Sequence, residues 1–295
     1  MNAGDRVIRD IADTARLAAA YRALESERPD PVFRDPFARR LAGPRGEAML
    51  EAVPGGRRDA WAWVTRTYLF DQVIGEQVRQ GLDMVVNLAA GLDARPYRMP
   101  LPASLRWVEV DFPDLIDYKE QALEGERAAC SLERIRLDLS DVGARRALFE
   151  RLGRASKKAL VITEGLLIYL TPAEVGSLAE DLAAAPGFQR WVCEIVSPGL
   201  LRRLQREIGV RLSEADAPLK FGPEQGPAFF AEHGWEPVDV RSMLRTAARL
   251  KRVPLWMRLM SRLPESTGRQ GSSPWAGVCL LGRGGSAASP LRRAA

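Results

Sequence analysis

The sequence predicts an α/β fold built on a doubly wound, mostly parallel sheet of seven strands with helices on its faces. Beyond residue 81, short runs rich in β-branched residues alternate with segments of helical periodicity. The runs cover residues 84–89, 105–111, 134–140, 159–165, 190–197, 235–241 and 275–283. Helical connections of this length indicate right-handed crossovers, so neighbouring strands are expected to be parallel.

The chain reads as a single domain in four parts, because it shows no internal repeat and no long low-complexity linker. Helices are expected over residues 1–80, where residues 56–81 form one amphipathic helix that ends at Gly81. Residues 81–197 form the core of the sheet, residues 198–230 an insertion, and residues 231–295 the last part of the sheet.

Composition excludes several classes of protein. No stretch approaches the ~18 apolar residues of a transmembrane helix, and the first residues lack the apolar segment of a signal peptide, so a cytoplasmic location is expected. The three cysteines lie far apart and are expected to be buried, reduced thiols. With His233 as the only histidine, we expect no metal site.

The net charge of +5 does not by itself indicate nucleic-acid binding, because the arginines are spread along the chain among acids. We therefore expect no nucleic-acid partner. Residues 249–264 are amphipathic and basic, which is also typical of a segment that touches a membrane or a lipid-like substrate. Since Pro254 interrupts this segment, a surface helix packed on the sheet is favoured, and no membrane contact is expected.

A tight turn follows the first strand, in "MVVNLAAGLDARPYR" (residues 84–98). Gly91 allows a close approach of backbone and ligand, and the next helix N-terminus favours negative charge. A dinucleotide fingerprint would have three glycines here, and this turn has one.

Acids follow the next two strands. Asp111 lies twenty residues beyond Gly91, where a carboxylate can accept hydrogen bonds from both hydroxyls of an adenosine ribose. Asp138 can accept from an adenine amino group while Leu139 borders the ring. Asp111, Asp138 and Asp141 also suit helix N-caps, and that alternative stays open.

The fourth strand ends in "TEGLLIYL", where Glu164 lies in an apolar run. A carboxylate there is costly unless it meets a ligand ammonium or a buried arginine. Arg66 lies on a similarly apolar helix face, so one α-amino acid would suit both side chains. Thr171 and Glu174 begin the next helix with a capping box. Adenosine at one end and an amino acid at the other describe S-adenosylmethionine.

Several motifs closely resemble the leucine carboxyl methyltransferase family, especially its bacterial methyltransferases and polyketide carboxyl O-methyltransferases. They are "RALESERPDPVFRDPFARRLAG", "VTRTYLFDQ", "VVNLAAGLDARPYR", "WVEVDFPDLIDYK", "LDLSD" and "VITEGLLIYLTPAEV". The resemblance covers about residues 10–240. It implies a class I methyltransferase fold with a helical cap and an inserted lid, with S-adenosylhomocysteine as product. The implied cofactor contacts are Arg66, Gly91, Asp111, Asp138, Leu139 and Glu164.

The chain departs from the family pattern at Ala89, where a glycine is usual. A methyl group fits there if φ is negative, but the alanine is expected to lower cofactor affinity. Asp93 is expected to hold the turn by accepting local backbone donors. Asn87, Ala89 and Asp93 complete the predicted cofactor-binding set.

The methyl acceptor is predicted to be the carboxylate of a small natural-product or polyketide-like acid. A carboxylate arrives ionised, whereas a hydroxyl needs a base, and His233 is expected to be structural. Tyr169 is the candidate catalytic residue and, with Lys220, Phe221 and Tyr21, a candidate for acceptor binding. Tyr169 equally suits a core. The aromatic clusters around Trp63 and Phe221 are more typical of a core, and a lysine such as Lys220 is more typically solvated.

Other functions stay open. One is methylation of a phenol, an alcohol or a protein C-terminal carboxylate. A second is cofactor binding without catalysis, for which Ala89 is the only hint. A nicotinamide-dependent oxidoreductase is disfavoured, because Glu164 and Arg66 would have no purpose and no Tyr-x-x-x-Lys pattern is present. The sequence leaves the oligomeric state open.

Overall fold

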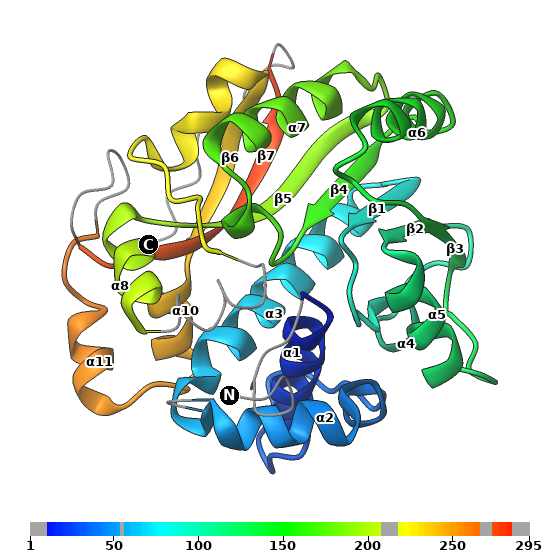
Figure 1. Ribbon diagram of the computed structural model, residues 1–295. Helices are drawn as coiled ribbons and strands as arrows, with labels where there is room; N and C mark the ends of the chain where they lie inside the picture. Colours follow the sequence, from blue (N-terminus) through cyan, green and yellow to red (C-terminus); the bar gives the residue numbers. More distant parts are fainter. Residues whose placement is uncertain (1–10, 54–55, 208–217, 266–272, 285–295) are drawn as a thin grey trace, which may run out of the picture.

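The sheet has the predicted seven strands. The computed structural model describes residues 11–53, 56–207, 218–265 and 273–284. Strand order is β3-β2-β1-β4-β5-β7-β6, and β7 alone runs antiparallel to its neighbours (Figure 1). The strands are β1 (Met84–Leu88), β2 (Arg106–Asp111), β3 (Ser131–Arg136), β4 (Ala159–Thr163), β5 (Phe188–Val196), β6 (Trp235–Ser242) and β7 (Ala276–Arg283).

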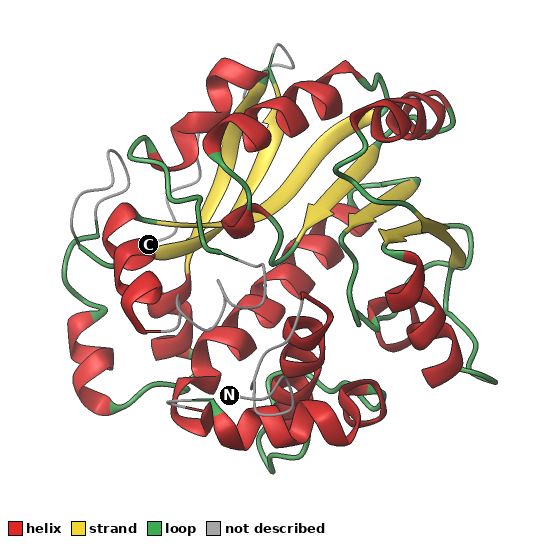
Figure 2. Ribbon diagram, in the orientation of Figure 1, coloured by secondary structure: helices red, strands yellow, loops and turns green. Residues whose placement is uncertain are grey.

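Helices cover both faces of the sheet (Figure 2). α6 and α7 pack on one face, and α3 and α10 on the other, because each presents an apolar side to the strands. The helices and 3-10 turns are α1 (Ile11–Ser26), α2 (Ala38–Ala52), α3 (Gly56–Arg79), α4 (Arg95–Arg98), α5 (Pro113–Ala122), α6 (Val142–Arg154), η2 (Leu167–Tyr169), α7 (Pro172–Ala184), α8 (Pro198–Glu207), η3 (Gly226–His233), α10 (Met243–Arg249) and α11 (Leu255–Met260).

A separate apolar cluster joins the N-terminal helices to the sheet. Leu17 of α1 and Leu41 of α2 pack with Leu92 from the turn after β1 and with Leu115 of α5. α1 and α2 therefore lie near the carboxyl ends of the strands. Part of the predicted insertion, residues 208–217, lies outside the described residues.

Local signals set the ends of the elements near the site. α3 ends before Gly81, whose φ is +83°, and α7 begins with the predicted capping box of Thr171 and Glu174. Only the third strand is displaced from its prediction. β3 ends at Arg136, opposite Asp111 of β2, and the chain then turns so that the Asp138 carboxylate accepts a hydrogen bond from the N–H of Ser140.

The arginine-rich segment before β7 forms two short helices, α10 and α11, separated at Pro254. The prediction that this whole segment packs on the sheet is wrong for α11, which has no buried residue. Within the described ranges, no helix combines the length and the apolar character needed to cross a bilayer.

Candidate active site

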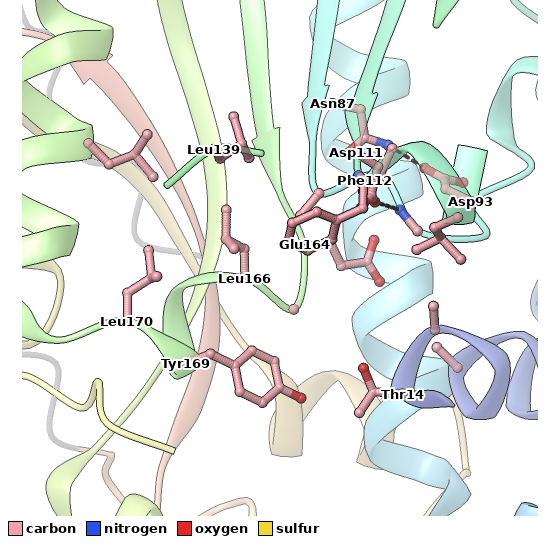
Figure 3. Close-up of a pocket in the computed structure, with 18 of the residues that line it drawn as sticks. Thr14, Asn87, Asp93, Asp111, Phe112, Leu139, Glu164, Leu166, Tyr169 and Leu170 are labelled. Atoms are coloured by element: carbon pink, nitrogen blue, oxygen red, sulfur yellow. Dashed lines mark hydrogen bonds between the residues drawn. The ribbon is translucent and has the colours of Figure 1, made fainter. Parts of the chain in front are cut away.

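One cavity of about 490 Å³ lies at the carboxyl ends of β1, β2 and β4, and α1 and α3 also contribute to its wall (Figure 3). Most of the predicted site residues line it together. They are Arg66, Asn87, Ala89, Gly91, Asp93, Asp111, Asp138, Leu139, Glu164, Tyr169 and Lys220. The prediction that strand ends would gather the acids at one edge of the sheet is therefore confirmed.

The turn after β1 places an L-residue in left-handed backbone. Ala89 and Gly91 both have a φ of +50°. The condition under which the Ala89 methyl group would fit without strain, a negative φ, is therefore not met. Glycine adopts this conformation freely, whereas alanine does so at a cost in free energy.

Asp93 holds the turn through its side chain, as predicted. Its Oδ1 accepts from the N–H of Arg95 at 2.9 Å, and its Oδ2 accepts from Asn87 Nδ2 at 3.0 Å and from Arg95 Nη1 at 2.8 Å. Burial alone would raise the pKa of Asp93, but the charge of Arg95 and other nearby cations holds that pKa well below its usual value. Asn87 and Asp93 line the cavity, and the hydrogen bond between them helps to hold the turn in place.

Asp111 retains acceptor capacity. Its Oδ2 accepts from the N–H of Gly91 at 2.6 Å, and its Oδ1 accepts from the N–H of Phe112 at 2.8 Å. Each carboxylate oxygen can accept a second hydrogen bond. Burial raises the pKa of Asp111, and the two backbone donors partly offset this rise. No ion pair compensates this carboxylate within the described part of the chain.

The edge of the cavity beyond β3 is partly apolar. Leu139 lines it, and Asp138 retains one oxygen that accepts no hydrogen bond from the described residues. Asp141 caps α6 by accepting from the N–H of Ala144, which is the alternative role considered for it. Sequence reasoning missed Phe112, which is 42% exposed at the cavity; its position directly after Asp111 was the available signal.

Glu164 lies between two arginines. Its Oε1 is 3.1 Å from Arg66 Nε, and its Oε2 is 2.8 Å from Arg95 Nη1. The Arg66 guanidinium also lies over the ring of Trp63, with 4.7 Å between its central carbon and the ring centroid. Of the two partners considered for Glu164, a buried arginine, Arg95, is therefore present.

Glu194 of β5 is a further acid beside this pair. Its Oε1 accepts from the N–H of Gly165 at 2.5 Å and lies 3.6 Å from Arg66 Nη1. Burial raises the pKa of Glu194 to about 7, although Arg66 opposes the rise. Sequence reasoning missed Glu194. The available signal was the same as for Glu164, an acid inside an apolar run, here at residues 190–197.

Tyr169 extends from η2 into the cavity, and its hydroxyl is directed towards Thr14 of α1 (Figure 3). Burial raises the pKa of Tyr169, while Arg66 and a hydrogen bond with Thr14 oppose the rise. Its ring therefore lines the site and also packs against the apolar cluster that joins the N-terminal helices to the sheet. Lys220 also lines the cavity and is exposed, while its backbone N–H donates to the carbonyl of Ile168 at 2.7 Å.

Two of the residues predicted to bind the acceptor, Tyr21 and Phe221, do not line the cavity. Tyr21 is buried, stacks on Trp63 with 5.1 Å between ring centroids, and donates its hydroxyl hydrogen to the carbonyl of Gly56. Burial raises its pKa to about 12. Phe221 is 1% exposed and packs on Phe230 in the core. Both side chains fill apolar space behind the cavity wall.

His233 is structural, as predicted. It lies at the end of η3, contacts Glu180 of α7 at 3.0 Å, and does not line the cavity.

Comparison with known proteins agrees with this geometry. The family model for leucine carboxyl methyltransferases matches residues 15–183. A protein of Mycobacteroides abscessus, assigned by name to the S-adenosyl-L-methionine-dependent methyltransferases, is 31% identical over 267 residues, covering 82% of this chain and 88% of that protein. A Parafrankia protein with the same assignment is 34% identical, with 79% of each chain covered.

Solved structures share the fold. A DUF574 family protein from Streptomyces avermitilis has a TM-score of 0.56 at 12% identity, covering 90% of this chain and 96% of that one. A protein from Thermobifida fusca, assigned to the methyltransferases, has a TM-score of 0.55 at 16% identity, covering 93% and 96%.

The sheet order and the acid-lined cavity at the strand ends define the class I methyltransferase fold. Within that class, the chain belongs to the leucine carboxyl methyltransferase family. The predicted fold, family and enzyme class, a S-adenosylmethionine-dependent methyltransferase, are confirmed, and the oxidoreductase alternative is set aside.

Proposed function

We propose that the chain binds S-adenosylmethionine in this cavity and transfers its methyl group to a carboxylate oxygen of a small acid. The observation that carries the proposal is the distribution of charge along the cavity. Glu164, which is paired with Arg66, follows β4 on one side of β1. Asp111 and Asp138, two carboxylates without cationic partners among the described residues, lie at the ends of β2 and β3 on the other side of β1.

The side chains fit this cofactor. The opposed charges of Glu164 and Arg66 match an ammonium and a carboxylate on one carbon atom. The free acceptor capacity of Asp111 suits two adjacent ribose hydroxyls, and the apolar surfaces of Phe112 and Leu139 suit a purine ring. The cavity volume also falls within the roughly 300–1,000 Å³ typical of small-molecule sites.

The bound cofactor supplies a methyl group on a sulfonium, so the protein has to align the acceptor with that group and exclude water. Among the described residues that line the cavity there is no histidine and no cysteine. The raised pKa of Tyr169 keeps its hydroxyl protonated at neutral pH, so it can donate a hydrogen bond but does not act as a base. A cavity that offers a hydrogen-bond donor but no base suits a methyl acceptor that is already ionised, such as a carboxylate.

The rest of the wall favours an apolar acid. Leu166 and Leu170 line the cavity beside Tyr169, and Lys220 supplies a cation nearby. A small acid with an apolar body would use both features. Methylation of a hydroxyl is the second candidate, but it would need a base, and Glu194, whose pKa is raised to about 7, does not line the cavity.

Cofactor binding is tested first by thermal shift with S-adenosylmethionine, S-adenosylhomocysteine and NAD. A ligand at a hundredfold excess over its Kd stabilises the fold by about 2.7 kcal/mol. We expect this shift with the two sulfur nucleosides only, its loss in Asp111→Ala and its retention in Asp141→Ala. Asp141 is the matched control because it caps α6 without lining the cavity. A shift with NAD alone would overturn the proposal.

The acceptor is tested by incubating the enzyme with the cofactor and a panel of apolar carboxylic acids, each paired with its primary alcohol. We expect S-adenosylhomocysteine to form with the acids, together with a methylated product that mild base hydrolyses, as an ester does. The rate with an acid should be nearly constant between pH 6 and 9. Base-stable ethers, formed at a rate that rises through pH 7, would support the hydroxyl alternative.

A further inference from the structure

An exposed apolar surface lies outside the cavity, on α11 and the residues that follow it. Five large apolar side chains of α11 and its C-terminal extension are more than half exposed: Leu255 (67%), Trp256 (61%), Leu259 (55%), Met260 (52%) and Leu263 (60%). The other two large exposed apolar residues in the described chain, Phe112 and Val142, both line the cavity. Single exposed apolar residues are ordinary, but a contiguous group marks an interaction site.

These five side chains, called the α11 face below, form one stripe. Leu255, Trp256, Leu259 and Met260, spaced i, i+1, i+4 and i+5, lie on one side of α11, and Leu263 follows in the turn after the helix. A surface helix normally turns such a stripe towards the core. Here the stripe points to solvent, while Met257 and Arg258 lie on the more covered side.

The sequence on both sides of the α11 face is rich in positive charge. Residues 243–265 contain six basic residues, at 245, 249, 251, 252, 258 and 262, and one acid, Glu265. Arg252 is paired with Glu25, and Arg245 lies 3.6 Å from Glu265. The other four basic side chains have no ion pair with any residue that the structure describes.

We propose that the α11 face binds the surface of an anionic lipid membrane. Leucine, methionine and tryptophan side chains enter the interface between headgroups and acyl chains, and arginine and lysine around them pair with anionic headgroups. α11 lies at the periphery of the molecule, away from the sheet (Figure 1). A convex, exposed helix can therefore lie along a membrane without any change in the fold.

Charge distinguishes a membrane from a second copy of the chain. A symmetric dimer through the α11 face would bring two clusters of unpaired arginines together, and the repulsion would oppose association. An anionic lipid surface instead neutralises them. The proposal concerns a surface separate from the cavity and does not depend on the identity of the methyl acceptor.

The test is co-sedimentation of the full chain with vesicles. We expect binding to vesicles of phosphatidylcholine with 30% phosphatidylglycerol, about tenfold weaker binding to pure phosphatidylcholine, and loss of binding in 0.5 M salt, because salt screens exposed charges. The double variant Trp256→Ser/Leu259→Ser should lose binding. Its melting temperature should stay at the wild-type value, because both side chains are exposed.

Charge is tested by a matched pair of reversals. Arg262→Glu should weaken binding to the anionic vesicles about tenfold, whereas Arg154→Glu, at an exposed position on α6, should leave it unchanged. Absence of binding by the wild type, or equal binding by the double variant, would overturn the proposal. A concentration-dependent dimer that the double variant loses, without vesicle binding, would also overturn it and assign the face to self-association.

Discussion

Replacement of Ala89 by glycine should stabilise this protein, although it removes a methyl group. Ala89 has a φ of +50°. Left-handed backbone costs an L-residue about 1–2 kcal/mol. Glycine avoids that cost. It also increases the conformational entropy of the unfolded chain, which lowers the free energy of unfolding by about 0.4–1 kcal/mol. Because Ala89 is only half-buried, little packing is lost, and the difference predicts a gain of about 0.5–1 kcal/mol.

Ala90 is the matched control. It is 7% exposed and is absent from the left-handed region, which among the described non-glycine residues holds only Ala89 and Lys251. Ala90→Gly loses a buried methyl group and gains unfolded-state entropy, so it should destabilise by about 1–2 kcal/mol. Urea unfolding of the two variants and the wild type, without ligand, measures both changes.

The two substitutions are thus expected to act in opposite directions. If Ala89→Gly destabilises the protein as much as Ala90→Gly, the backbone strain assigned to Ala89 is refuted. The sequence alone predicts weaker cofactor binding because of Ala89, but the strain is present with and without ligand and cancels in the binding free energy. The Kd for S-adenosylmethionine should therefore stay within about twofold of the wild type. A much tighter Kd in Ala89→Gly would instead mean that the methyl group obstructs the cofactor.

Three further predictions concern the framework of the site. The raised pKa of Glu194, about 7, means that its stabilising protonated form is fully present below pH 4.5 and is lost as the pH rises through 7. The melting temperature of Glu194→Gln relative to wild type should therefore be higher at pH 8 than at pH 5; a constant difference would contradict this. Thr171→Ala should cost about 1 kcal/mol in urea unfolding because it removes the capping box of α7, and Thr171→Ser should restore most of it. Arg95→Met should cost about 3–5 kcal/mol because it leaves buried carboxylates unpaired, and a change under 1 kcal/mol would refute that role.

The sequence predicts the parts of this site that local patterns set. Asp111 follows a strand directly, and the carboxyl ends of parallel strands meet at one edge, so its approach to Gly91 follows from topology alone. The capping box at Thr171 is likewise local. The third strand ends earlier than its composition predicted. Its last residue, Arg136, pairs with Asp111, the last residue of β2, so the neighbouring strand sets where β3 ends.

Contacts between distant parts of the chain could not be predicted in the same way. The Arg95–Glu164 ion pair joins the turn after β1 to the end of β4. No local pattern in either segment indicates that the two side chains are partners. Tyr21 was expected to contribute to acceptor binding. The ring of Trp63 and the carbonyl of Gly56 instead hold it behind the wall.

Charge balance in the cavity limits what it can bind. Five cationic side chains line it, and three of them, Arg22, Arg95 and Arg145, are held by buried acids. Arg66 is shared with Glu164, which leaves Lys220 as the cation without an ion pair in the described chain. If Arg66 meets the carboxylate of the cofactor, one positive charge remains for the acceptor. A buried anion without a partner is costly, so this arrangement favours an acid with a single carboxylate and an apolar body over a dicarboxylic acid.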